Sequence, residues 1–373
     1  MKRKLKYGLL IALLVLTTGC TTYLKNKDGK PVTNPTTGQS LAENILCRPT
    51  DAETIKLYED NDYDLSKLPY CVCNSEYVKE KVKVETTDAG NSEEKEEVKE
   101  STKKENKKEE ILPPNATAEQ TEEAENSQYE EKEVKCEAFS ITSGGYEGLW
   151  ATIFVKPLAW VILFFGKLTT SFGLGLIITS ILIRLAVYPL TKKSTIQAEN
   201  MKKIQPELQK IEKKYASKDQ NNREIMMQKS QEMMALYKKH NVSPMAGCLP
   251  ALLQLPLFIA FLDAINRVPA IFEEKFLLFH LGTTPKVGIV GGNWWYIILT
   301  ILVAVTTYYS LNKASNNQGV NNDMAKQTKM MTNVFTIMII VMSVFMSSAL
   351  NIYWIASNLC TLLQNYIVKR SMK

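Results

Sequence analysis

The sequence has few residues suited to metal or nucleotide chemistry. Only two histidines occur among its 373 residues, and both lie far from the cysteines of the amino-terminal half, so no zinc-binding spacing exists. The pair Gly166-Lys167 lacks the upstream glycine of a phosphate-binding loop. Residues 21–145 contain no apolar run long enough to cross a bilayer. We therefore expect no metal, no cofactor and no enzymatic activity.

The first twenty residues have the pattern of a secretory signal. Basic residues precede an apolar run from Tyr7 to Leu16, and the sequence Thr-Thr-Gly-Cys follows, ending at Cys20. Small residues directly before a cysteine resemble the bacterial lipobox. We expect residues 1–19 to be a lipoprotein signal peptide and Cys20 to carry the lipid. The alternative is an uncleaved signal anchor with an incidental cysteine.

The next part of the chain divides by composition. Residues 20–77 are expected to form an extracytoplasmic segment. Residues 78–145 are rich in charged and small polar side chains and poor in large apolar ones, which predicts a disordered charged linker. Disulfides can form in this part if the compartment is oxidising, but their connectivity stays open. The cysteines concerned are Cys47, Cys71, Cys73 and Cys136.

Apolar stretches separated by short polar links fill the second half of the chain. Five of them approach the roughly 20 residues that a hydrocarbon core of about 30 Å requires. They lie at residues 171–190, 248–267, 294–311, 332–347 and 350–368. The sequence therefore predicts an all-α polytopic membrane protein with a five-helix core at residues 168–373.

Basic residues set the predicted orientation of these helices. The link at residues 191–245 is dense in lysine, and lysine and arginine collect on the cytoplasmic side of membranes. Two amphipathic segments in this link predict a cytoplasmic helical hairpin. Alternation of the spans then places residues 268–293 outside and the carboxyl terminus inside. The candidate contact residues of the hairpin are Lys202, Lys203, Lys213 and Lys214.

The stretch at residues 146–167 tests this topology. It is apolar, but Lys156-Pro157 interrupts it. We interpret it as an amphipathic helix on the outer surface, with tryptophans at the headgroup level. The alternative is a further span, which would place the basic link outside.

One charge interrupts the first predicted span. Arg184 lies about 9 Å from the cytoplasmic end of that helix, and an arginine at the bilayer centre costs roughly 2.5–3.5 kcal/mol. Asp263, the only acidic residue in the predicted spans, lies near the outer end of the second, so we expect no direct pair. Either the Arg184 side chain reaches back to the inner interface, or a hydrated cavity surrounds it.

Other polar residues in the spans favour a cavity. Ser180 shares a helix face with Arg184, and Gln254 lies near the middle of the second span. The fifth span carries polar residues at a spacing of three and four, which places them on one face. These are Asn351, Trp354, Asn358, Thr361 and Asn365. The alternative is simple hydrogen bonding between helices, which requires no cavity.

Three stretches around the basic hairpin resemble the YidC membrane protein insertases and their mitochondrial oxidase-assembly and chloroplast relatives. They are ILIRLAVYPL at 181–190, GCLPALLQLPLFIAFLDAI at 247–265 and LNIYWIASNLCTLLQNYIVKR at 350–370. The lipobox fits the lipoprotein form of single-membrane bacteria. The resemblance implies insertion and folding of proteins in the cytoplasmic membrane through a cytoplasm-facing hydrophilic groove, with Arg184 at its centre and Gln254 and Trp354 in its wall.

The same resemblance implies nascent membrane proteins and membrane lipid as partners. It leaves open contacts with the ribosome, the signal recognition machinery and the Sec translocon, and we expect no direct nucleic-acid recognition. The candidate groove also includes Ser180, Asn351, Asn358 and Thr361. One alternative is an anion-selective channel or solute carrier, which the absence of internal repeats disfavours. Another is an assembly scaffold for membrane complexes.

Overall fold

The computed structural model describes residues 21–83, 129–216, 222–243, 249–315 and 323–372, and most of these are helical. Contacts divide the chain into two units, of which the smaller covers residues 73–137. The expected signal peptide and Cys20 lie outside the described residues.

The smaller unit contains an antiparallel pair of strands. Strand β1 (Tyr77–Lys83) pairs with β2 (Tyr129–Lys135), and a disulfide joins Cys73 to Cys136. The register sets Lys79 opposite Glu133 and Lys81 opposite Glu131. Residues 78–83 and 129–135 of the segment expected to be a disordered linker are therefore strands, and residues 84–128 lie outside the described part of the chain. Composition alone does not reveal a register between residues so far apart in the chain.

Residues 21–72 form an amino-terminal module within the larger unit. Helix α2 (Ala52–Glu59) and the short 3-10 helix η1 (Leu65–Lys67) accompany a core that includes Leu24, Leu41 and Tyr58. The Tyr58 hydroxyl donates to the Ala42 carbonyl oxygen at 2.6 Å. Burial raises the pKa of Tyr58, so the hydroxyl keeps its proton and remains a donor. A second disulfide joins Cys47 to Cys71.

A buried arginine attaches this module to the end of helix α8 (Leu249–Asn266). Arg267 is 1% exposed, forms an ion pair with Glu147 and donates from Nε to the Asn44 carbonyl oxygen at 2.5 Å. The Leu46 amide donates to the Arg267 carbonyl oxygen at 2.8 Å. A second contact follows at α9 (Pro269–Glu273), where the Thr50 amide donates to Glu273 at 2.8 Å. The module is thus packed onto the helices rather than tethered to them.

Two helices cross closely at the start of the helical core. A π-helical turn, η2 (Ala151–Val155), continues into α4 (Lys156–Thr169), which packs against α5 (Phe172–Lys203). A Cβ atom on Gly175 would lie 2.7 Å from the backbone nitrogen of Gly166, so only glycine permits this approach.

Both of these helices are long and apolar enough to span a membrane. The stretches concerned are Ala151–Thr169, with 19 residues, and Phe172–Met201, with 30. Length and composition do not distinguish a span from a helix lying on the surface. The outer-surface position expected for residues 146–167 therefore stays a prediction.

The basic link folds as a helical hairpin at its two amphipathic segments, and the first long helix extends further into the link than the predicted span. Helix α5 continues through residues 191–203 because nothing there breaks it, and the break falls at Ile204, just before Pro206. Helices α6 (Gln205–Ala216) and α7 (Arg223–Lys239) then pack together. Their shared core contains Ile204, Leu208, Leu236, Tyr237 and Val242.

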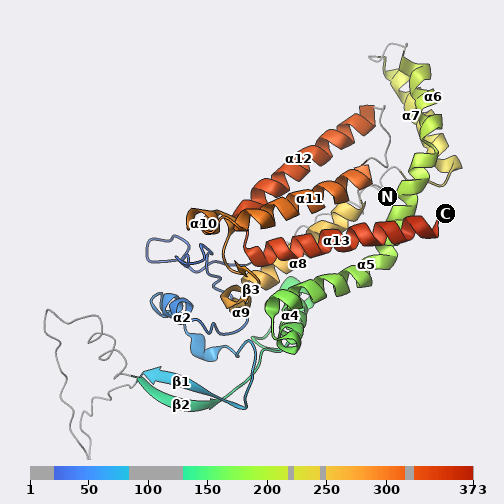
Figure 1. The fold of residues 1–373 in the computed structure, drawn as a ribbon. Helices are drawn as coiled ribbons and strands as arrows, with labels where there is room; N and C mark the ends of the chain where they lie inside the picture. Colours follow the sequence, from blue (N-terminus) through green and yellow to red (C-terminus); the bar gives the residue numbers. More distant parts are fainter. Residues whose placement is uncertain (1–20, 84–128, 217–221, 244–248, 316–322, 373) are drawn as a thin grey trace, which may run out of the picture. The chain divides into compact units, whose positions relative to one another are not determined.

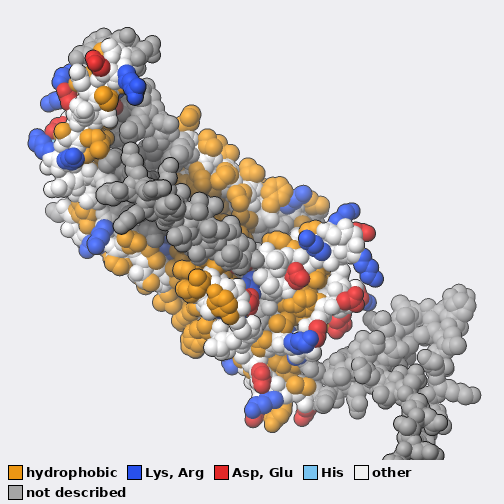
Figure 2. Space-filling view, turned by 180° about the vertical axis from the view of Figure 1, so that it is seen from behind, with side chains coloured by type: hydrophobic (Ala, Val, Ile, Leu, Met, Phe, Trp, Pro, Cys, Tyr) orange, Lys and Arg blue, Asp and Glu red, His pale blue; other side chains and the backbone are white. Residues whose placement is uncertain are grey.

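Three helices complete the core. Helices α11 (Tyr296–Ser315), α12 (Asp323–Phe345) and α13 (Ser348–Ser371) run alongside one another, and α13 also packs against α5 (Figure 1). Ser347 caps α13 by accepting a hydrogen bond from the Leu350 amide, which gives the tight turn expected between the last two helices. Hydrophobic side chains form a broad area on the surface, and charged side chains lie mainly outside it (Figure 2).

Backbone hydrogen bonds connect the turn between α12 and α13 to neighbouring segments of the chain. The connecting segment contains β3 (Lys275–Phe276), β4 (Phe279–His280) and α10 (Pro285–Val290). Ser348 donates to the Thr283 carbonyl oxygen at 3.0 Å, and Thr284 donates to the Thr37 carbonyl oxygen at 3.4 Å. The helix turn, the connecting segment and the amino-terminal module are therefore hydrogen-bonded one onto the next.

The double substitution Cys47→Ala with Cys71→Ala should destabilise the amino-terminal module. The cross-link spans 24 residues, and closing a loop of this size stabilises the folded state by about 3 kcal/mol. Limited proteolysis of the purified chain should show earlier cleavage within residues 21–72. The matched control is Cys73→Ala with Cys136→Ala, which removes the disulfide of the smaller unit. Equal protection of residues 21–72 in both variants would contradict the prediction.

Candidate functional site

A cavity of about 730 Å³ lies among the helices of the larger unit. Its walls come from η2, α4, α5, α8, α11, α12 and α13. Most of the wall is apolar, but polar side chains of α5, α8 and α13 enter it. Arg184 and Lys369 are the charged residues in this wall, among the residues that the structure describes. The site is thus an apolar cavity with localised positive charge.

Arg184 is held in the cavity wall by uncharged partners. Its side chain is 9% exposed, and Nε donates to the Ser357 hydroxyl oxygen at 2.8 Å. Nη2 donates to Ser357 and to the Gln254 side-chain oxygen. Gln364 donates from Nε2 to the Arg184 carbonyl oxygen at 2.8 Å, which joins α13 to α5. No carboxylate pairs with Arg184 among the described residues, so its charge is solvated by neutral dipoles alone.

As expected, Arg184 and Asp263 do not pair with each other. Asp263 is buried near the end of α8 and accepts a hydrogen bond from the Thr21 hydroxyl of the amino-terminal module. Asp263 therefore lies where the amino-terminal module contacts the end of α8, and it does not line the cavity.

The polar stripe of α13 faces the cavity and α11. Trp354 Nε1 donates to the Thr307 hydroxyl at 3.0 Å, and Asn358 Nδ2 donates to the same oxygen at 2.9 Å. Trp354 also meets the Phe258 ring edge-on, with centroids 4.7 Å apart. These contacts fix the indole against α8 and α11.

The structure brings six of the seven candidate groove residues to this cavity. The six are Arg184, Gln254, Asn351, Trp354, Asn358 and Thr361. Ser180 does not line it, because its hydroxyl donates to the Leu176 carbonyl oxygen of its own helix at 2.6 Å.

The hairpin lysines lie away from this site. Lys203, Lys213 and Lys214 are exposed, and Lys214 Nζ lies 2.5 Å from Glu232 Oε1 across the hairpin. The side chain of Lys202 is outside the described part of the chain. Any contact role of these residues stays a prediction.

Ser357 and Gln364 are hydrogen-bond partners of Arg184 that the sequence interpretation missed. They lie one position before Asn358 and Asn365, seven residues apart on the adjacent face of α13. A second polar stripe at this heptad spacing was the available signal. Thr307 of α11 was also missed, although Thr300 seven residues before it and Ser310 three residues after it share its helix face.

Comparisons with known proteins identify the family of this chain. The profile of the "60Kd inner membrane protein" family matches residues 164–373, more than half of the chain. "Membrane protein insertase YidC" of Oceanobacillus iheyensis is 36% identical over 230 residues, which cover 61% of this chain and 86% of the relative. "Membrane protein insertase MisCA" of Bacillus subtilis is 40% identical over 223 residues, 59% of this chain and 79% of the relative.

A solved structure described as "Active YidC insertase crystal structure with the first transmembrane domain resolved" is also similar. It is 25% identical, with a TM-score of 0.41, over 61% of this chain and 48% of that chain.

The long apolar helices and these relatives define a mostly helical protein of the membrane. The matched profile covers the cavity-lining helices from α5 to α13. The chain belongs to the YidC family of membrane protein insertases.

Replacing Arg184 with leucine should leave the folded chain as stable as before, or more stable. The substitution removes a buried charge whose partners are all neutral, and such a charge costs up to roughly 3 kcal/mol in a membrane helix. Thermal unfolding of the purified protein measures the effect. Gln254→Leu is the matched control, because it removes a partner of the arginine and leaves the charge in place. A midpoint for Arg184→Leu well below that of Gln254→Leu would show that Arg184 is needed for folding.

Proposed function

We propose that this chain inserts proteins into the cytoplasmic membrane by admitting their hydrophilic segments to the cavity around Arg184. The observation that carries the proposal is a buried guanidinium group without an acidic partner, placed where helices α5, α8 and α13 meet. A segment that bears carboxylates gains a charge-assisted hydrogen bond there. The apolar segment next to it can then move into lipid along the exposed hydrophobic surfaces of the helices.

The proposed topology has five spans: α5, α8, α11, α12 and α13. The hairpin of α6 and α7 and the carboxyl terminus are cytoplasmic in this proposal, because basic residues concentrate there. Residues 21–72 and the β1–β2 unit lie outside. The two disulfides support that placement, since disulfides persist in oxidising compartments. Residues 1–19 serve as the signal peptide, and lipid on Cys20 anchors the mature amino terminus.

The proposed groove is open to the cytoplasm. The cavity wall includes Thr191, Ser194 and Thr195 of α5 and Asn365 of α13, which are polar and lie towards the basic end of the helices. The other end of the helices is filled by buried apolar side chains such as Phe261, Ile265 and Tyr353. Water that reaches Arg184 from the polar end shortens the apolar path that a hydrophilic segment must cross.

Complementation of an insertase-depleted bacterial strain tests this function. Wild type should restore growth, Arg184→Lys should restore it in part, and Arg184→Glu should not restore it, because a carboxylate at this position repels acidic segments. Lys192→Glu is the matched control: it makes the same charge change on an exposed side chain of the same helix and should behave as wild type.

The outcomes separate the alternatives. Rescue by Arg184→Glu at equal membrane levels would exclude the charge-based mechanism. Failure of wild type, together with an anion conductance of the purified protein in planar bilayers, would favour a channel. Failure of wild type without conductance would favour an assembly scaffold.

A further inference from the structure

The cavity that holds Arg184 contains a second cation that no mechanism described above uses. Lys369 lines the same cavity from the last turn of α13, and no acidic side chain lines it among the described residues. The charged groups in the wall are therefore both positive. A cavity with this lining attracts carboxylates at two places rather than one.

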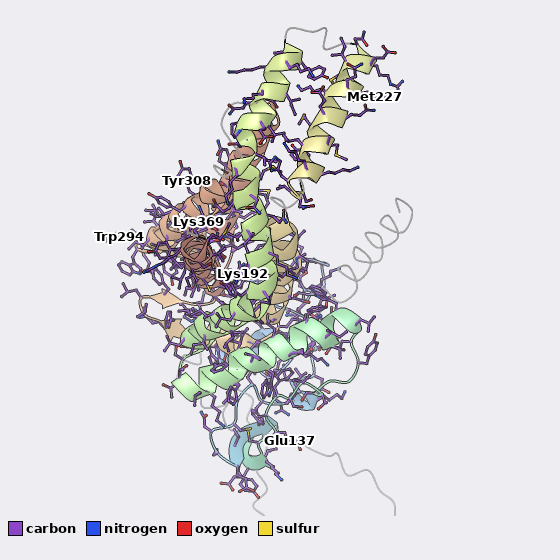
Figure 3. All side chains as sticks on the ribbon, turned by 90° about the vertical axis from the view of Figure 1, so that its right-hand side faces the viewer. Glu137, Lys192, Met227, Trp294, Tyr308 and Lys369 are labelled. Atoms are coloured by element: carbon purple, nitrogen blue, oxygen red, sulfur yellow. A yellow bond between two sulfur atoms is a disulfide. The ribbon has the colours of Figure 1, made fainter. Side chains whose placement is uncertain are left out.

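Lys369 forms an ion pair at one end of the cavity. Its Nζ lies 3.0 Å from Glu199 Oε1 of α5, and the side chains are 29% and 18% exposed. One turn before Lys369, the Thr195 hydroxyl donates to the Asn365 side-chain oxygen at 2.9 Å. Figure 3 shows Lys369 near the end of α13 and Lys192 on α5. The two helices are thus joined by polar contacts at the end where the proposed groove opens.

A polar path leads from Lys369 to Arg184. Asn365, Thr361 and Asn358 line the cavity between Lys369 and the turn of α13 that contacts Arg184. Ser357 and Lys369 are separated by about 18 Å along the helix axis, at 1.5 Å per residue. Hydrogen-bonding groups therefore accompany a polar segment over the whole distance between the two cations.

We propose that Lys369 is the entry cation of the groove and that Glu199 occupies it until a substrate carboxylate takes its place. This inference rests on the proposed insertion function and adds the substrate feature that Lys369 recognises: acidic residues in the hydrophilic segment that enters first. The displaced carboxylate of Glu199 returns to solvent as the segment moves towards Arg184.

Carboxylate binding should be weaker at Lys369 than at Arg184, which fits an order in which the substrate meets Lys369 first. A partly exposed ion pair contributes only about 0.2–1 kcal/mol, so a substrate carboxylate can replace Glu199 at low cost. Arg184 is more deeply buried and has neutral partners, so it binds a carboxylate more strongly. An extended chain advances about 3.3 Å per residue. Acidic residues roughly five or six positions apart can therefore contact Lys369 and Arg184 together.

Insertion into proteoliposomes that contain the full chain tests this proposal. The probes are two single-span substrates that differ only in the translocated tail, which carries two aspartates six residues apart in one and two asparagines in the other. Lys369→Gln should slow insertion of the acidic tail about two- to five-fold and leave the neutral tail unchanged. Glu199→Gln should accelerate the acidic tail by a similar factor. Arg370→Gln, which removes the neighbouring exposed charge, is the matched control and should match wild type.

A charge swap separates substrate capture from a structural role of the ion pair. The double variant Glu199→Lys with Lys369→Glu keeps an ion pair between α5 and α13 but places a carboxylate in the cavity wall. If Lys369 captures substrate carboxylates, insertion of the acidic tail should stay slow in this variant, while the neutral tail should insert as in wild type. The proposal would be overturned if the swap restored the insertion rate of the acidic tail, or if Lys369→Gln slowed insertion of both tails equally. If wild type inserts neither tail, the proposed function itself fails.

Discussion

The polar centre of the helical core is arranged around Arg184, which is buried among neutral groups. Its guanidinium donates hydrogen bonds to Ser357 of α13 and Gln254 of α8, and Gln364 of α13 donates one to the Arg184 carbonyl oxygen. Three helices that are distant in sequence therefore converge on one residue. Because a buried charge must be solvated, these partners cannot be lost without cost, and the polar residues of α13 face inward rather than towards lipid.

The two ends of the core differ in the kind of contact that holds them. Near the α12–α13 turn, apolar side chains fill the interior, and backbone hydrogen bonds link the turn to the segment at residues 281–284 and that segment to the amino-terminal module. At the other end, the contacts between α5 and α13 are side-chain bonds such as Glu199 to Lys369. Side-chain contacts exchange with water and ligands more readily than packed backbone, which is consistent with the proposed opening of the groove at this second end.

Local patterns predicted the centre of the site, and long-range packing determined the rest. A lone arginine in an apolar helix and a stripe at three-four spacing point to Arg184, Trp354 and Asn358 from sequence alone. Ser357 and Gln364 form a second polar stripe on the adjacent face of α13, but the sequence does not tell which face meets Arg184, because tertiary contacts set the rotation of α13 about its axis. The same limit applies to the β1–β2 pairing and to the docking of residues 21–72, since both join segments that are far apart in the chain.

Under the proposed mechanism, a comparison of the two buried arginines explains why the partners of Arg184 are neutral. Arg267 is paired with Glu147, and breaking such a pair costs about 3–5 kcal/mol, which suits a permanent contact at the end of α8. Had Arg184 an equivalent carboxylate, each incoming substrate would have to break that pair first. Ser357 and Gln254 instead are neutral acceptors, and their bonds from the guanidinium are weaker than the bidentate ion pair that a substrate carboxylate offers. Exchange is then favourable on entry, and because the neutral partners can re-form their bonds, release does not leave the charge unsolvated.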